Sequence, residues 1–233
     1  MTYEPRQGRF NAIDKVLAVL NGKETAILTT HINSDGDGCG SEVALCAWLR
    51  ARGTEAFIVN PTPIPQSLRF LVPDDSWVVD AKSDEAREVC DAGDVAVVLD
   101  TGEIPRIGRV RPLIEGLETL VIDHHPTGDR PIEGVAFRDT SAAATGELVF
   151  DLMHRAGGPW PKHADLPIYV SILTDTGGFR FSNTTATCLH IIAELVERGV
   201  SPYDTHRRVY GTSPRRRIRL LQSALASLEV DEK

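Results

Sequence analysis

Short apolar runs of strand length alternate with segments of helical periodicity over the first half of the chain. Five of these runs are ETAILTTH (24–31), TEAFIVN (54–60), SWVVD (76–80), DVAVVLD (94–100) and ETLVIDHH (118–125). Short, continuous strands of valine, isoleucine and leucine separated by helices are typical of a parallel sheet covered on both faces. We therefore predict an α/β fold in which a mostly parallel sheet carries helices on both faces.

Helical patterns flank these runs. Apolar residues recur at helical spacing from Phe10 to Leu20, and Asn21-Gly22 follows as a helix stop. From about residue 142 only helical segments follow, the last of them at 213–230. Its apolar face consists of Ile218, Leu221, Leu225 and Leu228. Its first turns are basic and contain Arg215, Arg216, Arg217 and Arg219. These arginines indicate a solvated helix face or, as the alternative, a phosphate-binding patch.

Composition narrows the class of protein. With 233 residues, 42% of them hydrophobic, the chain can bury a substantial core. Its net charge of −8 argues against a nucleic-acid coat protein but leaves room for a small anionic substrate. There is no signal-peptide pattern, no apolar run of membrane-spanning length and no C-x-x-C pair among Cys39, Cys46, Cys90 and Cys188. We predict a cytoplasmic enzyme with no membrane association and with free, packed thiols.

Acidic and imidazole side chains gather where the predicted strands end. The first strand leads into His31, Asp35 and Asp37, the fourth ends at Asp100, and the fifth ends at Asp123-His124-His125. Asp175 closes the apolar helical segment IYVSILTD and precedes a glycine turn. Since ligands bind outside the carboxyl ends of parallel strands, we expect these four segments to deliver their side chains to one rim.

Converging carboxylates raise one another's pKa values, and bound divalent cations relieve this repulsion. Oxygen and imidazole ligands without thiolate suit Mn²⁺, Mg²⁺ or Fe²⁺ better than a structural zinc. Six or seven candidate ligands are too many for one ion and about right for two that share a carboxylate. Two such ions, about 3.5–4 Å apart, can stabilise the attacking and leaving oxygens of a phosphoryl displacement. The pattern therefore predicts a phosphoester hydrolase with two divalent cations.

Two other interpretations of the loop THINSDGDGCG (30–40) compete with this one. Aligned as an EF-hand calcium loop, it places Ala44 at the twelfth position, where a bidentate glutamate is required, and this interpretation fails. In the second, the aspartates only cap a helix that begins near Gly40-Ser41 and the glycines make turns. The additional acids at 100, 123 and 175 argue against a purely structural role.

Four motifs resemble those of the DHH phosphoesterases, a family named for an Asp-His-His triplet. They are HINSDGDG (31–38), LDTG (99–102), DHH (123–125) and ILTDTGGFRFSNTT (172–185). Each motif is weak alone, but four in order over most of residues 24–185 are specific. Within the family, TDTGGFRFSNTT is most similar to the branch of nanoRNases and phosphoadenosine-phosphate phosphatases.

The resemblance implies a role for each residue at a motif position. His31 and Asp35 would hold the first metal, Asp37, His124 and Asp175 the second, and Asp100 would bridge them. His125 would face the substrate phosphate and act on the leaving oxygen. Asp123 would orient a ligating histidine rather than bind metal.

The glycines of the opening loop are interpreted as turn formers. Gly36, Gly38 and Gly40 would let the backbone turn sharply, so that Asp35 and Asp37 reach different ions. They would also leave room for a phosphate at the amino terminus of a helix beginning near Ser41.

The segment GGFRFSN provides candidate substrate contacts. Arg180 could hold a phosphate while Phe179 or Phe181 stacks on a base. Alternatively, both phenylalanines belong to the core and Arg180 pairs with an acid. Arg106, which follows DTGEIP, is a further candidate.

We expect a hydrolase, with Mn²⁺ as its cofactor, that trims short oligonucleotides or removes phosphate from 3′-phosphoadenosine-5′-phosphate. Alternatives are a phosphodiesterase for cyclic di-AMP or pApA and a nucleotide-binding module without turnover. An inorganic pyrophosphatase would leave Phe179 and Phe181 without an evident purpose. The resemblance also implies a homodimer, because relatives often form one.

The resemblance finally implies a second, smaller domain. Relatives continue into a DHHA1 domain with a GGGH-like motif, which does not occur in this sequence. We expect residues 1–190 to form the phosphoesterase domain and 191–233 to be connecting helices of a longer protein, or else the chain to be a natural one-domain member. The chain alone should bind metals but hydrolyse nucleotides weakly.

Overall fold

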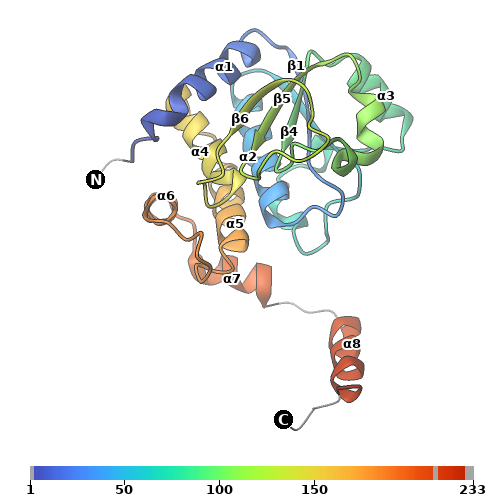
Figure 1. Cartoon of the computed structure of the whole chain (residues 1–233), viewed down its shortest axis with the longest axis vertical. Helices are drawn as coiled ribbons and strands as arrows, with labels where there is room; N and C mark the ends of the chain where they lie inside the picture. Colours follow the sequence, from blue (N-terminus) through green and yellow to red (C-terminus); the bar gives the residue numbers. More distant parts are fainter. Residues whose placement is uncertain (1–2, 212–214, 229–233) are drawn as a thin grey trace.

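The computed structural model describes residues 3–211 and 215–228, and its strands form one six-stranded sheet (Figure 1). The strands are β1 (Thr25–Thr29), β2 (Glu55–Asn60), β3 (Val78–Asp80), β4 (Val95–Leu99), β5 (Glu118–Asp123) and β6 (Val135–Arg138). Their order is β3-β2-β1-β4-β5-β6, and every pair of neighbours is parallel. The predicted α/β class with a parallel sheet is confirmed.

The strand order changes direction at β1. The chain builds the sheet outward from β1 through β2 to β3, and then returns to the other side of β1 to add β4, β5 and β6. In an open α/β sheet such a reversal leaves a crevice outside the carboxyl ends of the two central strands. These two strands end at Thr29 of β1 and Leu99 of β4, and we expect a ligand site beyond them.

Helices cover both faces of the sheet. The α-helices are α1 (Phe10–Leu20), α2 (Gly36–Ala51), α3 (Asp84–Asp91), α4 (Thr145–Ala156), α5 (Asp165–Asp175), α6 (Ala186–Glu197), α7 (Pro202–Tyr210) and α8 (Arg215–Ala226). The 3₁₀ helices are η1 (Gln7–Arg9), η2 (Arg69–Leu71), η3 (Asp75–Trp77) and η4 (Ile104–Leu113). Side chains of α1, α2, α4 and α5 share the core of one face, and those of α3 and η4 share the core of the other.

Strand β6 was not predicted from the sequence. β6 is four residues long, lies at the edge of the sheet and has only Phe137 fully buried. Its short sequence VAFR follows a polar loop and lacks the continuous valine and leucine run of the central strands. An edge strand this short gives too weak a pattern to predict.

The predicted role of the loop glycines is wrong. Helix α2 begins at Gly36, so Gly36, Gly38 and Gly40 lie inside it and do not form turns. They allow close packing instead: a Cβ on Gly40 would lie 2.4 Å from the carbonyl oxygen of Pro167, and one on Gly36 would lie 2.4 Å from Oγ1 of Thr174. Glycine is therefore required where α2 lies against α5.

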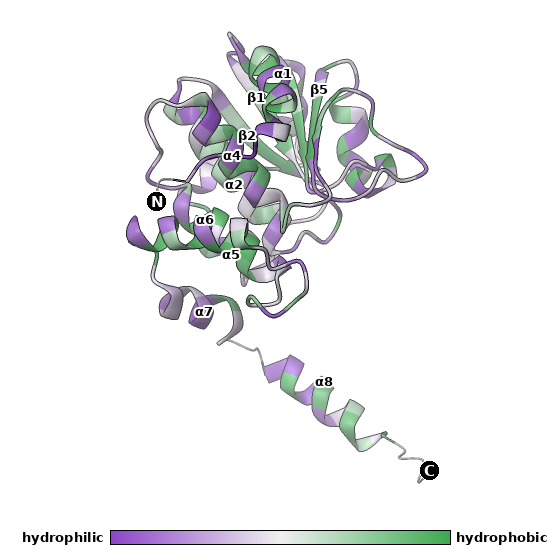
Figure 2. Ribbon diagram, turned by 60° about the vertical axis from the view of Figure 1, so that its left-hand side comes forward, coloured by the Kyte–Doolittle hydropathy of each residue, from purple (hydrophilic) through white to green (hydrophobic). Residues whose placement is uncertain are grey.

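The helices after α5 differ in how they pack. Cys188, Ile191 and Leu195 of α6 are buried in the same core as α4 and α5, whereas every described side chain of α8 is exposed. Figure 2 shows α8 with hydrophobic and hydrophilic residues on different faces. Part of the predicted helix 213–230, namely 213–214 and 229–230, lies outside the described residues. The domain boundary at residue 190 stays a prediction.

All four cysteines are buried free thiols, as the sequence indicated. Among residues 3–211 and 215–228, no helix combines the length and the apolar character needed to cross a membrane.

We expect Gly40→Ala to destabilise the fold, although alanine is the better helix former by about 1 kcal/mol. The added methyl group would force α5 away from α2, and such overpacking costs about 1–3 kcal/mol. The free energy of unfolding, measured in urea, should fall by an amount in that range. Gly8→Ala is the control, because nothing lies within 4 Å of its Cβ position. An equal change in the two variants would contradict the packing argument.

Candidate metal centre

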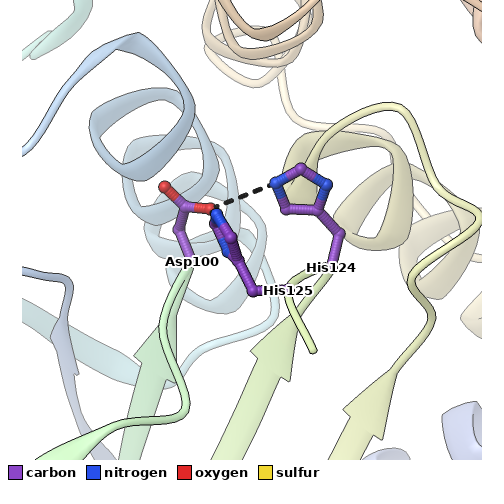
Figure 3. Close-up of side chains that lie close together, drawn as sticks. All are labelled: Asp100, His124 and His125. Carbon is purple, nitrogen blue, oxygen red and sulfur yellow. Dashed lines mark ion pairs between the residues drawn. The ribbon is translucent and has the colours of Figure 1, made fainter. Parts of the chain in front are cut away.

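All six predicted metal ligands lie together at the carboxyl edge of the sheet, and Asp35 is the most exposed of them. Figure 3 shows Asp100, His124 and His125 converging from the ends of the neighbouring strands β4 and β5. Ligand atoms lie within 4.8 Å of one another in three overlapping groups: His31, Asp35 and Asp100; Asp37, His124 and Asp175; Asp100, His124 and His125. Each of these groups could hold a metal ion.

Asp37 is the most tightly held of these acids. Its side chain is 1% exposed and lies in the first turn of α2. Its Oδ1 accepts hydrogen bonds from Ser41 Oγ (3.1 Å), Ser171 Oγ (2.5 Å) and the backbone N–H of Gly146 (3.1 Å). Its Oδ2 accepts from the backbone N–H of Thr145 (2.8 Å). Three helices therefore fix this carboxylate.

His124 presents a free nitrogen to three carboxylates. Its Nε2 lies 3.5 Å from Asp37, 3.7 Å from Asp100 and 3.6 Å from Asp175, and it is buried without a hydrogen-bond partner. These distances are too long for hydrogen bonds. The other ring nitrogen, Nδ1, donates to the carbonyl oxygen of Ala142 (3.3 Å). A histidine that binds metal commonly donates its second N–H to a carbonyl group in this way.

His31 has the same arrangement on the other side of Asp100. Its Nδ1 donates to the carbonyl oxygen of Ile32 (3.0 Å), and its Nε2 faces Asp100 Oδ2 at 3.3 Å. Since Asp100 Oδ1 faces His124, the two oxygens of this one carboxylate point toward different histidines. Asp100 has a φ of +59°, a conformation that is costly for a residue with a side chain and is typical of functional sites.

Burial and the closeness of the acidic side chains raise the pKa values of Asp100 and Asp175. Burial, and then the charges of Asp37 and Asp35, raises the pKa of Asp100 well above its ordinary value. Burial and the charge of Asp37 raise the pKa of Asp175 to about 6. Without a cation, both carboxyl groups therefore lose their proton less readily than an exposed aspartate does. A bound cation would lower their pKa values again.

Asp35 serves as the cap of α2. Its Oδ1 accepts from the backbone N–H groups of Asp37 (3.0 Å) and Gly38 (3.2 Å), and its side chain is 62% exposed. The helix cap that we considered as an alternative is therefore present, but four residues earlier than expected. His31 Nε2 lies 3.9 Å from the same oxygen, so Asp35 can cap the helix and still face the cluster.

Asp123 orients a different histidine from the one expected. Its Oδ1 accepts from His125 Nδ1 (2.9 Å) and from the His125 backbone N–H (3.0 Å), whereas the Ala142 carbonyl orients His124. This hydrogen bond raises the pKa of His125, which the nearby Arg106 guanidinium opposes. At 43% exposed, the His125 side chain is the member of the triplet that is open to solvent.

The four residues predicted to contact substrate differ in how far they are exposed. Phe179 is half-buried against Tyr169, with ring centroids 6.2 Å apart, whereas Phe181 is 58% exposed. Arg180 is exposed, and its Nε donates to the carbonyl oxygen of Gly177 (2.7 Å). Arg106 is exposed near His125. The core interpretation holds for Phe179 but not for Phe181.

Three residues that were not predicted from the sequence hold the acids in place. Thr145 Oγ1 donates to Asp100 (3.0 Å), Ser171 donates to Asp37, and Asn183 Nδ2 donates to the backbone oxygen of Asp175 (3.1 Å). Thr145-Gly146 follows three alanines and opens an apolar helix, which is a signal for a helix terminus only. No local pattern shows that this terminus meets Asp37.

One protein-family model matches the chain across the whole of its sheet. The family model described as "DHH family, N-terminal domain" matches residues 25–174. This range contains all six strands of the sheet and the Asp-His-His triplet at 123–125.

Curated relatives include bifunctional oligoribonuclease and PAP phosphatases NrnA from two bacteria. The protein of Thermus thermophilus is 36% identical over 84% of this chain and 57% of its own length. That of Bacillus subtilis is 34% identical over 81% of this chain and 58% of its own. The chain therefore spans somewhat over half the length of these relatives.

Solved structures support the same fold. An exopolyphosphatase-related protein from Bacteroides fragilis superposes with a TM-score of 0.87 at 25% identity, covering 100% of this chain and 68% of that one. A putative family II inorganic pyrophosphatase from Methanococcus jannaschii superposes with a TM-score of 0.55 at 18% identity, covering 78% and 60%. The similarity to the pyrophosphatase concerns the fold alone.

The raised pKa values predict how stability depends on pH when a chelator keeps metal away. Because folded Asp175 binds a proton with a pKa of about 6 and unfolded aspartate with a value near 3.8, the folded state holds more protons between these values. The free energy of unfolding should therefore fall as the pH rises through this window, by at most about 3 kcal/mol from this group. Urea unfolding at several pH values measures it.

Asp175→Asn provides the comparison, since it removes the titrating group and keeps the size of the side chain. Its unfolding free energy should depend less on pH than that of the unsubstituted protein. An unchanged or steeper fall in the variant would show that Asp175 does not carry this dependence.

Proposed function

The chain belongs to the DHH family, and from this premise we propose that it is a metal-dependent phosphoesterase whose reaction centre is the cluster around Asp100. The observation that carries the proposal is the buried Nε2 of His124, which has no hydrogen-bond partner and faces three carboxylates. A nitrogen lone pair among several acids suits a divalent cation, because buried polar atoms otherwise find partners.

We propose two ion sites that share Asp100. His31 and Asp35 belong to the first, and Asp37, His124 and Asp175 belong to the second, in keeping with the overlapping groups of ligand atoms. Oxygen and imidazole ligands without thiolate favour Mn²⁺, with Mg²⁺ or Fe²⁺ as alternatives. Two divalent cations supply the positive charge that stabilises both the attacking and the leaving oxygen of a phosphoester.

The residues of the chain provide orientation and a proton. Asp123 accepts from Nδ1 of His125 and so directs Nε2 of this exposed ring away from Asp123. A substrate at the rim could receive a proton from that nitrogen on its leaving oxygen. Arg106, close enough to His125 to influence its pKa, would contact the phosphate.

Short oligonucleotides and 3′-phosphoadenosine-5′-phosphate are the substrates that we propose. The support is the names of the two NrnA relatives, each matched over more than four fifths of this chain. The exposed Phe181 ring beside Arg180 gives a base a surface on which to stack. We further propose that a second domain, as in longer relatives, completes the substrate site, and that the protein is a homodimer.

Hydrolysis tests the proposed activity directly. With Mn²⁺ present, the protein should release mononucleotides from a labelled dinucleotide, and the rates on pApA, phosphoadenosine phosphate and cyclic di-AMP rank the substrates. Asp100→Asn should lower the rate by a factor on the order of 100 or more, because it removes the carboxylate shared by both ion sites. Metal binding without turnover on any of these would instead favour a nucleotide-binding module. Full activity of Asp100→Asn would contradict the assignment of the bridge.

The exposed ring of Phe181 should contribute to substrate binding. We expect Phe181→Ala to raise the KM for a dinucleotide about tenfold with a smaller effect on kcat, since stacking on one base is worth about 1–3 kcal/mol. Tyr203→Ala is the matched control, because Tyr203 is an aromatic residue that is 75% exposed on α7. Equal KM values for the two variants would refute the stacking role.

A further inference from the structure

The first described residues form an arm that is anchored by a buried arginine. We call Tyr3 to Arg9 the N-terminal arm; it precedes the stretch matched by the family model, which begins at residue 25. Arg9 is only 3% exposed and forms ion pairs with Asp139 (2.7 Å), Glu147 (2.8 Å) and Asp151 (2.7 Å). These pairs raise the pKa of Arg9 and help to lower that of Asp139 to about 2, so both groups are charged at neutral pH.

The arm holds the loop of residues 139–144, which joins β6 to α4. Arg9 binds Asp139 at its start, and Arg6 donates to Ser141 Oγ (2.8 Å) in its middle. Glu147, which pairs with Arg9, accepts from the backbone N–H of Ala143 through its other oxygen (3.1 Å). The arm thus fixes the beginning, the middle and the end of the 139–144 loop.

The opposite side of this loop contacts the second proposed ion site. The carbonyl of Ala142 accepts from His124 Nδ1, and the carbonyl of Ala143 accepts from Asn183 Nδ2 (3.0 Å), which also contacts Asp175. The loop then leads into the backbone N–H groups of Thr145 and Gly146, which bind Asp37. The loop therefore contacts His124 directly and Asp175 through Asn183, and it precedes the two α4 residues whose N–H groups bind Asp37.

Apart from Asp100, which the two sites share and which accepts from Thr145 Oγ1 (3.0 Å), the ligands of the first proposed ion site have no hydrogen bond to this loop among the described residues. His31 is oriented by its neighbour Ile32, and Asp35 is held by the backbone of α2. A disturbance of the arm should consequently affect the two sites unequally. This separates a positioning role from a general contribution to stability, which would weaken both sites together.

We infer that the N-terminal arm is a positioning element for the second ion site, with Arg9 and Arg6 holding the 139–144 loop so that His124, Asp37 and Asp175 face one cation. The inference rests on the proposed two-metal function. Arg9 and Arg6 form no hydrogen bond or ion pair with the proposed metal ligands, and they act through the side chains of Asp139 and Ser141 in the loop.

Binding of Mn²⁺ measured by calorimetry on the whole chain tests the inference. Two variants, Arg6→Gln and Arg9→Lys, should each weaken one of the two binding events. Arg6 is partly exposed, and Arg9→Lys keeps the positive charge but loses the planar guanidinium group. We expect a loss of about 10-fold to 100-fold, the range for groups that orient metal ligands. The other binding event should change by less than about twofold.

Arg155→Gln is the matched control. Arg155 links α4 to α1 through two hydrogen bonds to Asp14 (2.9 and 3.0 Å), but among the described residues it forms no hydrogen bond or ion pair with the 139–144 loop. Both binding events should be unchanged in this variant. Equal weakening of the two events by Arg6→Gln, or no weakening of either, would overturn the inference, even if Arg9→Lys fails to fold.

A second measurement keeps the inference separate from the proposed function. In the metal-free protein, the ring ¹⁵N signals of His124 should report the Nδ1–H tautomer, which Arg6→Gln should shift toward a mixture while Arg155→Gln leaves it unchanged. If the unsubstituted protein binds no Mn²⁺ but the tautomer responds in this way, the metal function fails and the arm still positions His124. An unchanged tautomer in Arg6→Gln contradicts the positioning role.

Discussion

The site depends on one buried carboxylate, that of Asp37, which accepts hydrogen bonds from three helices at once. Ser41 donates from its own helix, Thr145 and Gly146 donate from the first turn of α4, and Ser171 donates from α5. Backbone N–H groups at a helix amino terminus stabilise an anion, because the dipole of the helix is positive there. The anion in this case belongs to the protein, and it determines how closely the three helices approach.

That approach explains the glycines around it. A Cβ on Gly146 would lie 2.1 Å from Oγ of Ser171, and a Cβ on Gly40 would lie 3.0 Å from Cβ of Ser171. With larger residues at these positions, Ser171 could not reach Asp37. Asp100 lies between His31 and His124 and has a positive φ, and burial together with the charges of Asp37 and Asp35 raises its pKa.

The sequence predicted those features that depend on local patterns. The parallel sheet and the meeting of His31, Asp100 and His124 followed from apolar runs that end in acid or imidazole, because parallel strands bring their carboxyl ends to one edge. The start of α2 could not be predicted, since glycines at 36, 38 and 40 disfavour a helix until their contacts with α5 and Thr30 are known. The pairing of Asp123 with His125, and the separation of Phe179 from Phe181, likewise depend on packing between distant segments.

The central claim is that this cluster binds two cations that share Asp100. Crystals grown with Mn²⁺ and measured at the manganese absorption edge would test it most directly. The account predicts two anomalous peaks about 3.5–4 Å apart, one beside His31 and Asp35 and the other beside Asp37, His124 and Asp175, with Asp100 between them. A single peak, or none at these side chains, would contradict it.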